Sequence, residues 1–398
     1  DVERSRGLGD VYKRQIYPMS KLIYLDNSAT TQVDVEVAKI VHEELSHLSG
    51  NPSSWHTLGQ IAKKKLFRSR ESIAKYLRVD SSEIIFTSGG TEGLNTLIFG
   101  LASLFTPGEI ITTTIEHPAV QKPLLHLEQQ GWRIITPSIS EYGAITADQL
   151  QGLITDNTKM IVLSASNHET GVKLDLEAIS SIANSYQIPL IIDGIATLGK
   201  SSLQIHKGIT AMAFSGHKLH ALPGTGFIYL RLGQSISPLL YGGAQENGFR
   251  SGTENLPGIV GLAKAIRLFA ENERSIVDEI QRLRDLFEGI IFSHLSNVYI
   301  NGLGPRVPNI SNLYIEGIDA EDIVLQLDSH GVVASMGSAC SSGNFEPSQV
   351  LIQMGYSQRR ASQSIRFSLS RMNTEAEIIH AGKLLCQIVL SLLQESKR

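Results

Sequence analysis

The sequence predicts an α/β fold with a large, mostly parallel seven-stranded sheet and a second, smaller α+β domain. Two observations support this prediction. Short apolar runs alternate with stretches of helical spacing over much of the chain, which is the pattern of repeated strand–helix units. The chain has 398 residues, 42% of them hydrophobic, which is enough for two domains and a sizeable core.

Each expected strand of the large sheet is a short apolar run that ends at turn residues or a polar cluster. The seven expected strands span residues 83–87, 109–114, 132–137, 160–166, 189–193, 211–214 and 226–230. Ligands of such open sheets bind beyond the carboxyl ends of the strands, so the residues that follow these runs are the first candidates for a site.

The remaining elements flank the large sheet. Before it we expect a strand at 21–26 and helices at 33–48 and 58–77. After it we expect one long helix ending near residue 292, strands at 298–301 and 309–314, a helix at 319–330, a loop at 336–344, and then two helices with a strand between them. These later elements make up the smaller α+β domain.

Charge and composition exclude several classes of function. The formal net charge is −4, so we expect neither a nucleic-acid partner nor a membrane partner, and the longest apolar run, near 384–393, is too short to span a bilayer. Only two cysteines occur, Cys340 and Cys386, which argues against a disulfide framework and fits a reducing compartment. We therefore expect a cytoplasmic protein, and we expect no metal site.

Two strand ends carry residues with a specific chemistry. Lys218 follows the apolar run at 211–214, where partial desolvation would free its amine for Schiff-base formation. Asp193 stands at the carboxyl end of the preceding run. A surface lysine and a helix-capping aspartate are the alternative readings of each residue alone. Together they match what a protein supplies to pyridoxal phosphate, a Schiff-base lysine and a carboxylate facing the pyridinium nitrogen.

Other polar residues gather at the same edge. A glycine-rich turn at 88–92 leads into a helix, and its backbone N–H groups with the helix dipole suit a phosphate, although such turns often bind nothing. The residues that lie just past expected strand ends are Gly90, Thr91, His117, Asn167, His168, Asp193 and Lys218. Their convergence is stronger evidence for a site than any one motif.

The two cysteines have different surroundings. Cys386 lies among apolar helix residues, and we interpret it as core packing. Cys340 lies among Gly, Ser and Ala in the loop at 336–344, where a thiol can reach a site and react as thiolate. An incidental loop cysteine is the alternative for Cys340.

A set of motifs in fixed order resembles the NifS/IscS-type cysteine desulfurases, class V within the fold type I of pyridoxal-phosphate-dependent transferases. The resemblance extends from about Lys21 to the C-terminus. The motifs are LDNSATT at 25–31, GNPSS at 50–54, TSGGTE at 87–92, EH at 116–117, ETG at 169–171, SGHK at 215–218, RSGT at 250–253, GSAC at 337–340 and SIRFSL at 364–369.

The resemblance implies how the cofactor is held. Lys218 would bind pyridoxal phosphate as a Schiff base, Asp193 would keep the ring nitrogen protonated, and His117 would stack on the ring and move protons. The phosphate would be bound by Gly90, Thr91, Ser215 and His217, together with Thr253 from the partner subunit of a homodimer. Asn167 and His168 are expected to bind the cofactor as well.

The resemblance also implies the reaction. Arg366, with Asn27 nearby, would hold the carboxylate of L-cysteine, since its planar fork suits that group. Cys340 would attack the substrate sulfur, giving L-alanine and a persulfide on Cys340. The persulfide would pass to an acceptor protein of unknown identity, for iron–sulfur cluster assembly or tRNA thiolation.

The sequence also predicts a division of the chain into segments. Residues 1–18 would be a non-native or disordered extension, and residues 19–32 an N-terminal segment near the site that packs with the small domain. Residues 33–265 would form the large cofactor-binding domain. Residues 266–398 would form the small domain that carries the Cys340 loop.

The sequence departs from the family pattern at three places. His168 stands where the family usually has the Asn that contacts the phenolic oxygen of the cofactor, and Ala196 replaces a Gln that donates to the same oxygen. Residues 221–223, Ala-Leu-Pro, replace the usual Gly-Pro-Lys. An imidazole can still donate a hydrogen bond, so the hypothesis is that fewer or different donors hold this oxygen.

Four alternative functions remain open at this point. A related enzyme with the same cofactor could be a selenocysteine lyase, a C–S lyase or an aminotransferase, and an aminotransferase would not need Cys340. A non-catalytic scaffold or binding protein is an alternative of another class. Bound cofactor colours the purified enzyme yellow, whereas a scaffold without cofactor would be colourless.

Overall fold

The computed structural model describes residues 22–48, 50–337 and 346–395. Its large sheet has seven strands in the order β2-β8-β7-β6-β5-β3-β4. Strand β8 is antiparallel to β2 and β7, and all other neighbours are parallel, so the prediction of a mostly parallel seven-stranded sheet is confirmed. The strands are β2 (Ile84–Thr87), β3 (Glu109–Ile111), β4 (Arg133–Ile135), β5 (Thr158–Ser164), β6 (Leu190–Asp193), β7 (Ala211–Ser215) and β8 (Gly226–Leu230).

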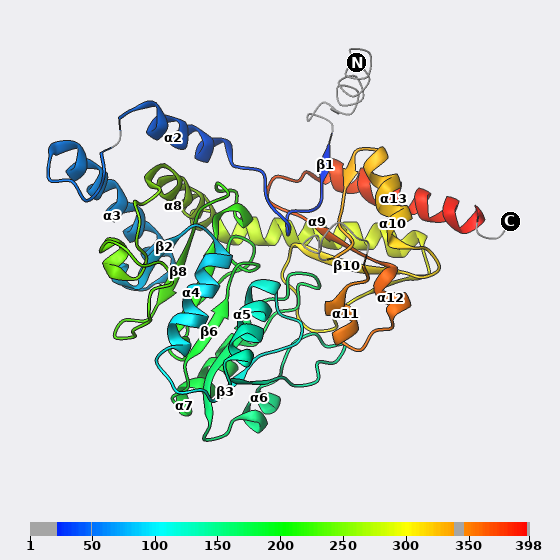
Figure 1. Cartoon of the computed structure of the whole chain (residues 1–398). Coiled ribbons are helices and arrows are strands. Elements are labelled where there is room, and N and C mark those ends of the chain that lie inside the picture. Colours follow the sequence, from blue (N-terminus) through cyan, green and yellow to red (C-terminus); the bar gives the residue numbers. More distant parts are fainter. Residues whose placement is uncertain (1–21, 49, 338–345, 396–398) are drawn as a thin grey trace, which may run out of the picture.

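Helices cover both faces of this sheet (Figure 1). Alternate residues of a strand point to opposite faces. In β5, Ile161 and Leu163 therefore pack in the core with α2, α3, α7 and α8, whereas Met160 and Val162 pack with α4 and α5. The helices are α2 (Val35–Ser46), α3 (Thr57–Leu77), α4 (Gly90–Ala102), α5 (Pro118–Gln129), α6 (Ala147–Leu153), α7 (Leu176–Ser185) and α8 (Leu256–Ala270).

The smaller α+β part has its own core, in which the side chains of Phe287, Leu313, Phe367 and Leu385 are buried. Its sheet is antiparallel, in the order β12-β10-β9. The elements are α9 (Glu273–His294), β9 (Val298–Ile300), β10 (Ile310–Ile315), α10 (Ala320–Ser329), β11 (Val332–Val333), α11 (Gln349–Gln353), α12 (Gln358–Ser362), β12 (Ser364–Ser368) and α13 (Glu375–Glu395).

Two expectations about helices differ from the structure. The single helix expected up to residue 292 is two helices, because Asn272 leaves the helical conformation (φ −134°, ψ 22°) between α8 and α9. Between the segment that was expected to form a loop, most of which lies outside the described residues, and β12, the structure has α11 and α12. Gly355 at φ 90° ends the first of these helices, and the Ser357 side chain caps the second.

The N-terminal segment connects the two parts of the molecule. Strand β1 (Ile23–Tyr24) pairs in parallel with β11, and the backbone N–H of Asn27 donates to the carbonyl of Ser368 at 3.1 Å. A few residues later, the N–H of Thr31 donates to the carbonyl of His217 at 2.8 Å. The exact division of the chain into segments stays a prediction.

Helix α13 is, within the described residues, the one helix long and apolar enough to cross a membrane by length and composition. Its most apolar stretch is 44% buried. Ile378, Leu385 and Val389 of α13 are buried in the core that the helix shares with α9. These contacts are those of a core helix in the smaller part.

The core of the smaller part provides a test of the fold. Phe287 on α9 is fully buried, and its ring centroid lies 4.8 Å from that of Phe367. We expect Phe287→Ala to lower the free energy of unfolding by about 3–5 kcal/mol, because a large cavity remains. The matched control is Phe292→Ala on the same helix, where the side chain is 42% exposed and the loss should stay below about 1 kcal/mol. Equal losses in urea denaturation would contradict this packing.

Candidate active site

A pocket of about 240 Å³ lies beyond the carboxyl ends of β5, β6 and β7. The edge of a parallel sheet brings these strand ends together, although they are far apart in the sequence. The sequence-predicted residues that line the pocket are Gly90, Thr91, His117, His168, Asp193, Ser215, His217 and Lys218.

Lys218 lies in the short 3-10 helix η3 (Gly216–Lys218) that directly follows β7. Its Nζ donates to the carbonyl oxygens of Ser28 and Ala29, the second at 2.7 Å. The N-terminal segment therefore holds the amine over the pocket from one side. These carbonyl contacts leave the amine in position to react with an aldehyde in the pocket.

Asp193 supplies a buried carboxylate at the end of β6. It is 6% exposed and accepts a hydrogen bond from the backbone N–H of Ile195 at 2.9 Å. Burial raises the pKa of Asp193 to about 6, while the Ile195 N–H and the charge of Lys218 act in the opposite direction. Among the described residues no ion pair to Asp193 is found, so its charge is incompletely compensated. A protonated pyridine nitrogen would supply that compensation, which fits pyridoxal phosphate.

The N-terminus of α4 forms the anion-binding end of the pocket. A Cβ at Gly90 would lie 2.1 Å from Cδ1 of Ile195, so any larger residue there would displace the Ile195 side chain at the edge of the pocket. Thr91 and Ser215 place hydroxyl groups at this end. The unpaired N–H groups and the dipole of the 13-residue helix favour a phosphate here.

Two histidines contact each other across the pocket. His117 caps α5, and its Nδ1 accepts from the backbone N–H of Ala119 at 3.0 Å, so a neutral His117 carries its proton on Nε2. Burial and the charge of Lys218 lower the pKa of His117 to about 4. The His117 and His168 rings meet edge to face, with centroids 5.2 Å apart. Both imidazoles are therefore neutral near pH 7 in this structure.

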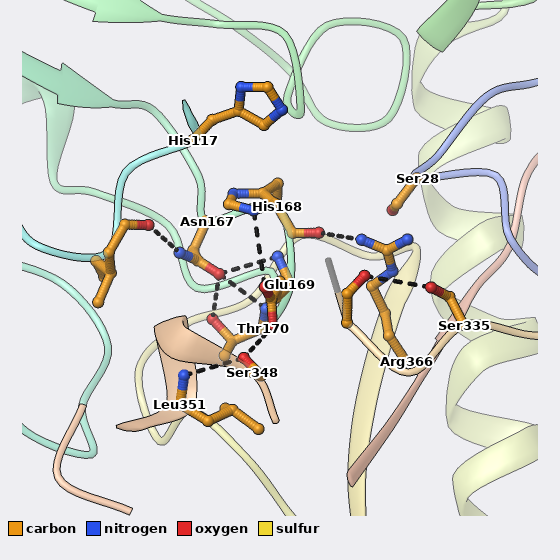
Figure 2. A network of polar contacts seen from close by, with 12 residues as sticks. Ser28, His117, Asn167, His168, Glu169, Thr170, Ser335, Ser348, Leu351 and Arg366 are labelled. Atoms are coloured by element: carbon orange, nitrogen blue, oxygen red, sulfur yellow. Dashed lines mark hydrogen bonds and ion pairs between the residues drawn. The ribbon is translucent and has the colours of Figure 1, made fainter. Parts of the chain in front are cut away.

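Arg366 lies next to the pocket, and its guanidinium is hydrogen-bonded to other residues of the chain. Its guanidinium is 3% exposed, donates from Nη1 to the carbonyl of His168 at 3.0 Å, and forms an ion pair from Nη2 to Asp26 at 2.8 Å. Its Nε has no hydrogen-bond partner in the described part of the chain. Figure 2 shows the guanidinium between His168 and the segment that carries Ser28.

Several expected site residues lie elsewhere. Asn167 is buried, accepts from the backbone N–H groups of Glu169 and Thr170, and donates to the carbonyl of Ile115, so its amide holds the turn. Asn27 donates to the carbonyl of Ser368 at 2.9 Å. Thr253 lines a separate hollow with Arg250 and Glu254. Cys340 lies outside the described residues.

The structure adds a second buried lysine that the sequence interpretation missed. Lys200 is 4% exposed, lines the pocket, and donates from Nζ to the carbonyl of Lys218 at 2.5 Å. Burial and the charge of Lys218 lower the pKa of Lys200 to about 7. Its only sequence signal is a position seven residues after Asp193, and nothing local predicts its burial. Other lining residues that were missed are Ser28, Ala29, Ala119, Ser164, Ser166 and Ile195.

Comparison with known proteins agrees with this geometry. The family model for aminotransferase class-V matches residues 23–380. A cysteine desulfurase of Nostoc sp. is 40% identical over 373 residues, which is 92% of this chain and 93% of that protein. Cysteine desulfurase NifS of Azotobacter vinelandii is 37% identical, with 89% of this chain and 90% of that protein covered.

Solved structures resemble the chain over nearly its whole length. A structure described as a NifS-like protein has a TM-score of 0.86 and 31% identity, covering 93% of this chain and 100% of that one. A structure described as SspA in complex with cysteine has a TM-score of 0.79 and 29% identity, covering 88% and 100%.

The fold and the lysine–aspartate pocket define an enzyme class that uses pyridoxal phosphate. Within that class, the chain belongs to the class-V aminotransferase family. The resemblance to NifS/IscS-type cysteine desulfurases is confirmed, since curated relatives of that name are 36–40% identical over most of the chain.

Lys200 predicts a specific pH dependence of stability. Its pKa falls from 10.5 to about 7 on folding, so the unfolded chain binds the extra proton between these values and stability rises with pH there. We expect Lys200→Met to flatten the rise in unfolding free energy between pH 7.5 and 9.5 by roughly 1 kcal/mol per pH unit. The control is Lys207→Met, at an exposed lysine. An unchanged slope in urea unfolding of Lys200→Met would contradict the burial of a titrating amine.

Proposed function

We propose that this chain is a pyridoxal-phosphate-dependent cysteine desulfurase that forms L-alanine from L-cysteine and keeps the sulfur as a persulfide on Cys340. The observation that carries the proposal is the buried carboxylate of Asp193 beside Lys218 in one pocket. The desulfurase names of the relatives support the choice of substrate.

The residues of the pocket would hold and polarise the cofactor. When bound, pyridoxal phosphate supplies an electron sink for breaking bonds at the substrate carbons. Asp193 would keep a proton on the ring nitrogen, and Lys218 would hold the aldehyde carbon. The phosphate would be held by Gly90, Thr91, Ser215 and His217, with Thr253 contributed by the second subunit of a homodimer.

Arg366 would bind the substrate carboxylate. Its Nη2 pairs with Asp26 and its Nη1 with a carbonyl, which fixes the plane of the guanidinium. A fixed, buried guanidinium binds a carboxylate at a lower entropic cost than a mobile one. Asn27 would act indirectly, since its hydrogen bond to Ser368 holds the segment that carries Asp26 against β12.

His117 would move protons at the substrate. It is neutral, faces the pocket, and carries its proton on Nε2 when uncharged. A neutral imidazole can accept a proton at its unprotonated nitrogen, and the imidazolium that forms can donate a proton back. His117 would therefore supply or withdraw protons at the carbons that lose and gain hydrogen.

Sulfur transfer would end on Cys340. Its thiolate would form an S–S bond to the substrate sulfur while the C–S bond breaks. The electron pair of that C–S bond stays with the substrate carbon, which takes up a proton and becomes the methyl group of alanine. A thiol of an acceptor protein would then take the outer sulfur from the persulfide. Iron–sulfur cluster assembly and tRNA thiolation are the two proposed destinations, in the cytoplasm.

The two cysteines provide a matched test. We expect Cys340→Ala to lose at least about a hundredfold in alanine formation from L-cysteine with a thiol reductant, because no other nucleophile is proposed for the sulfur. Cys386→Ala is the control, since Cys386 is buried in the core of the smaller part and should keep near-parental activity. Equal activity of both variants would rule out the persulfide route and favour a C–S lyase. Activity only with other amino acids would favour an aminotransferase.

A further inference from the structure

His168 is the one pocket residue at which this chain replaces the amide usual for the family with an imidazole. An amide always has an N–H to donate, whereas each nitrogen of a neutral imidazole either donates or accepts. Whether His168 can donate a hydrogen bond to a ligand therefore depends on which ring nitrogen carries the proton. The neighbours of the ring determine which nitrogen that is.

The neighbour of His168 on the side away from the pocket is Glu169. Glu169 is 1% exposed, and its Oε1 has no hydrogen-bond partner within the described residues. Oε1 lies 3.9 Å from Nε2 of His168, and Figure 2 shows the two groups directed at each other. This distance is too long for a hydrogen bond, but a small rotation of the two side chains would close it.

The other carboxylate oxygen of Glu169 is fixed by a directed chain of hydrogen bonds. The backbone N–H of Leu351 donates to Oγ of Ser348 at 3.1 Å, and Ser348 donates to Oε2 of Glu169 at 2.5 Å. Oε2 is therefore an acceptor. Because it is, any proton on this carboxyl group belongs on Oε1, the oxygen that faces His168 (Figure 2).

Close packing around Glu169 restricts the position of its carboxyl group. Gly337 has a φ of 104°, and a Cβ there would lie 2.9 Å from Oε2, so a larger residue would strain the backbone and press on the carboxyl group. Burial raises the pKa of Glu169, partly offset by the Ser348 hydroxyl and by the charge of Arg366. The pKa of His168 is well below its usual value, chiefly because of burial and further because of the neighbouring His117 and the positive charges of Arg366 and Lys218. Both shifts act towards the uncharged forms of the two side chains.

We propose that Glu169 sets the tautomer of His168: Oε1–H of Glu169 donates to Nε2, and His168 thereby presents an N–H at Nδ1. The chain of donors then runs from Leu351 through Ser348 and Glu169 to His168, and its last N–H replaces the amide donor that the family usually has at position 168. Glu169 is a positioning residue in this scheme. The inference rests on the proposed function only for the identity of the group that would accept this N–H.

Glutamine at position 169 gives a sharp test because the Ser348 hydroxyl favours one orientation of its amide. Ser348 donates to Oε2 in the parent, so we expect the amide oxygen of Glu169→Gln to take the place of Oε2 and the amide N–H₂ to face Nε2 of His168. This variant should hold the Nδ1–H tautomer at every pH. Glu169→Leu removes the donor, and the ring should return to the Nε2–H tautomer that free histidine prefers.

The experiment is two-bond ¹H–¹⁵N correlation spectroscopy of the full chain with ¹⁵N-labelled histidine, where His168→Asn assigns the His168 signal. We expect Nδ1–H at pH 7 in the parent and in Glu169→Gln, and a change in tautomer ratio of about tenfold towards Nε2–H in Glu169→Leu. An Nε2–H tautomer in the parent, or an equal ratio in the parent and Glu169→Leu, would overturn the proposal.

A pH series keeps the proposal testable if Glu169→Leu does not fold. As pH rises and Glu169 loses its proton, Oε1 becomes an acceptor and the parent should change to Nε2–H, whereas Glu169→Gln should not. The same pH response in both proteins would contradict the scheme. The tautomer is measured without substrate, so failure of the desulfurase assay would bear on the proposed function alone.

Discussion

The burial of an incompletely compensated carboxylate at the end of β6 is the constraint on which the site depends. Asp193 is 6% exposed, and isolating a charge from water is costly unless a cation or hydrogen bonds compensate it. One backbone N–H from Ile195 supplies part of that compensation. The pocket between Asp193 and Lys218 thus favours a ligand with a protonated ring nitrogen. The surrounding residues line the space that such a ligand would fill.

The walls come from parts of the chain that a sheet and a short segment hold together. Strands β5, β6 and β7 deliver Ser164, Asp193 and Ser215 to one edge because they run in parallel. The N-terminal segment then closes the pocket, with Ser28 and Ala29 over Lys218. The ion pair of Asp26 and Arg366 attaches that segment to the smaller part, so the residue proposed to bind the substrate also helps to hold the pocket together.

Some of this arrangement could be predicted from sequence, and the reason is geometric. Lys218 and Asp193 directly follow apolar runs, and in a parallel sheet every such position lies at the same edge. The burial of Lys200 and Glu169 could not be predicted from the sequence, because it depends on elements packed over these residues rather than on their neighbours in sequence. The contact of Arg366 with Asp26 joins residues 340 positions apart, which no local pattern contains. Asn167 was expected to bind the cofactor because it lies just past a strand. Its side chain instead accepts hydrogen bonds from the backbone of the turn that follows.

The central claim is that Lys218, and not the more deeply buried Lys200, is the amine that binds pyridoxal phosphate. The most direct measurement is to add the cofactor to the purified chain, reduce the Schiff base with borohydride, and map the pyridoxyl group by peptide mass spectrometry. The account predicts one pyridoxyl group, on Lys218. A pyridoxyl group on Lys200, or none on either lysine, would contradict it.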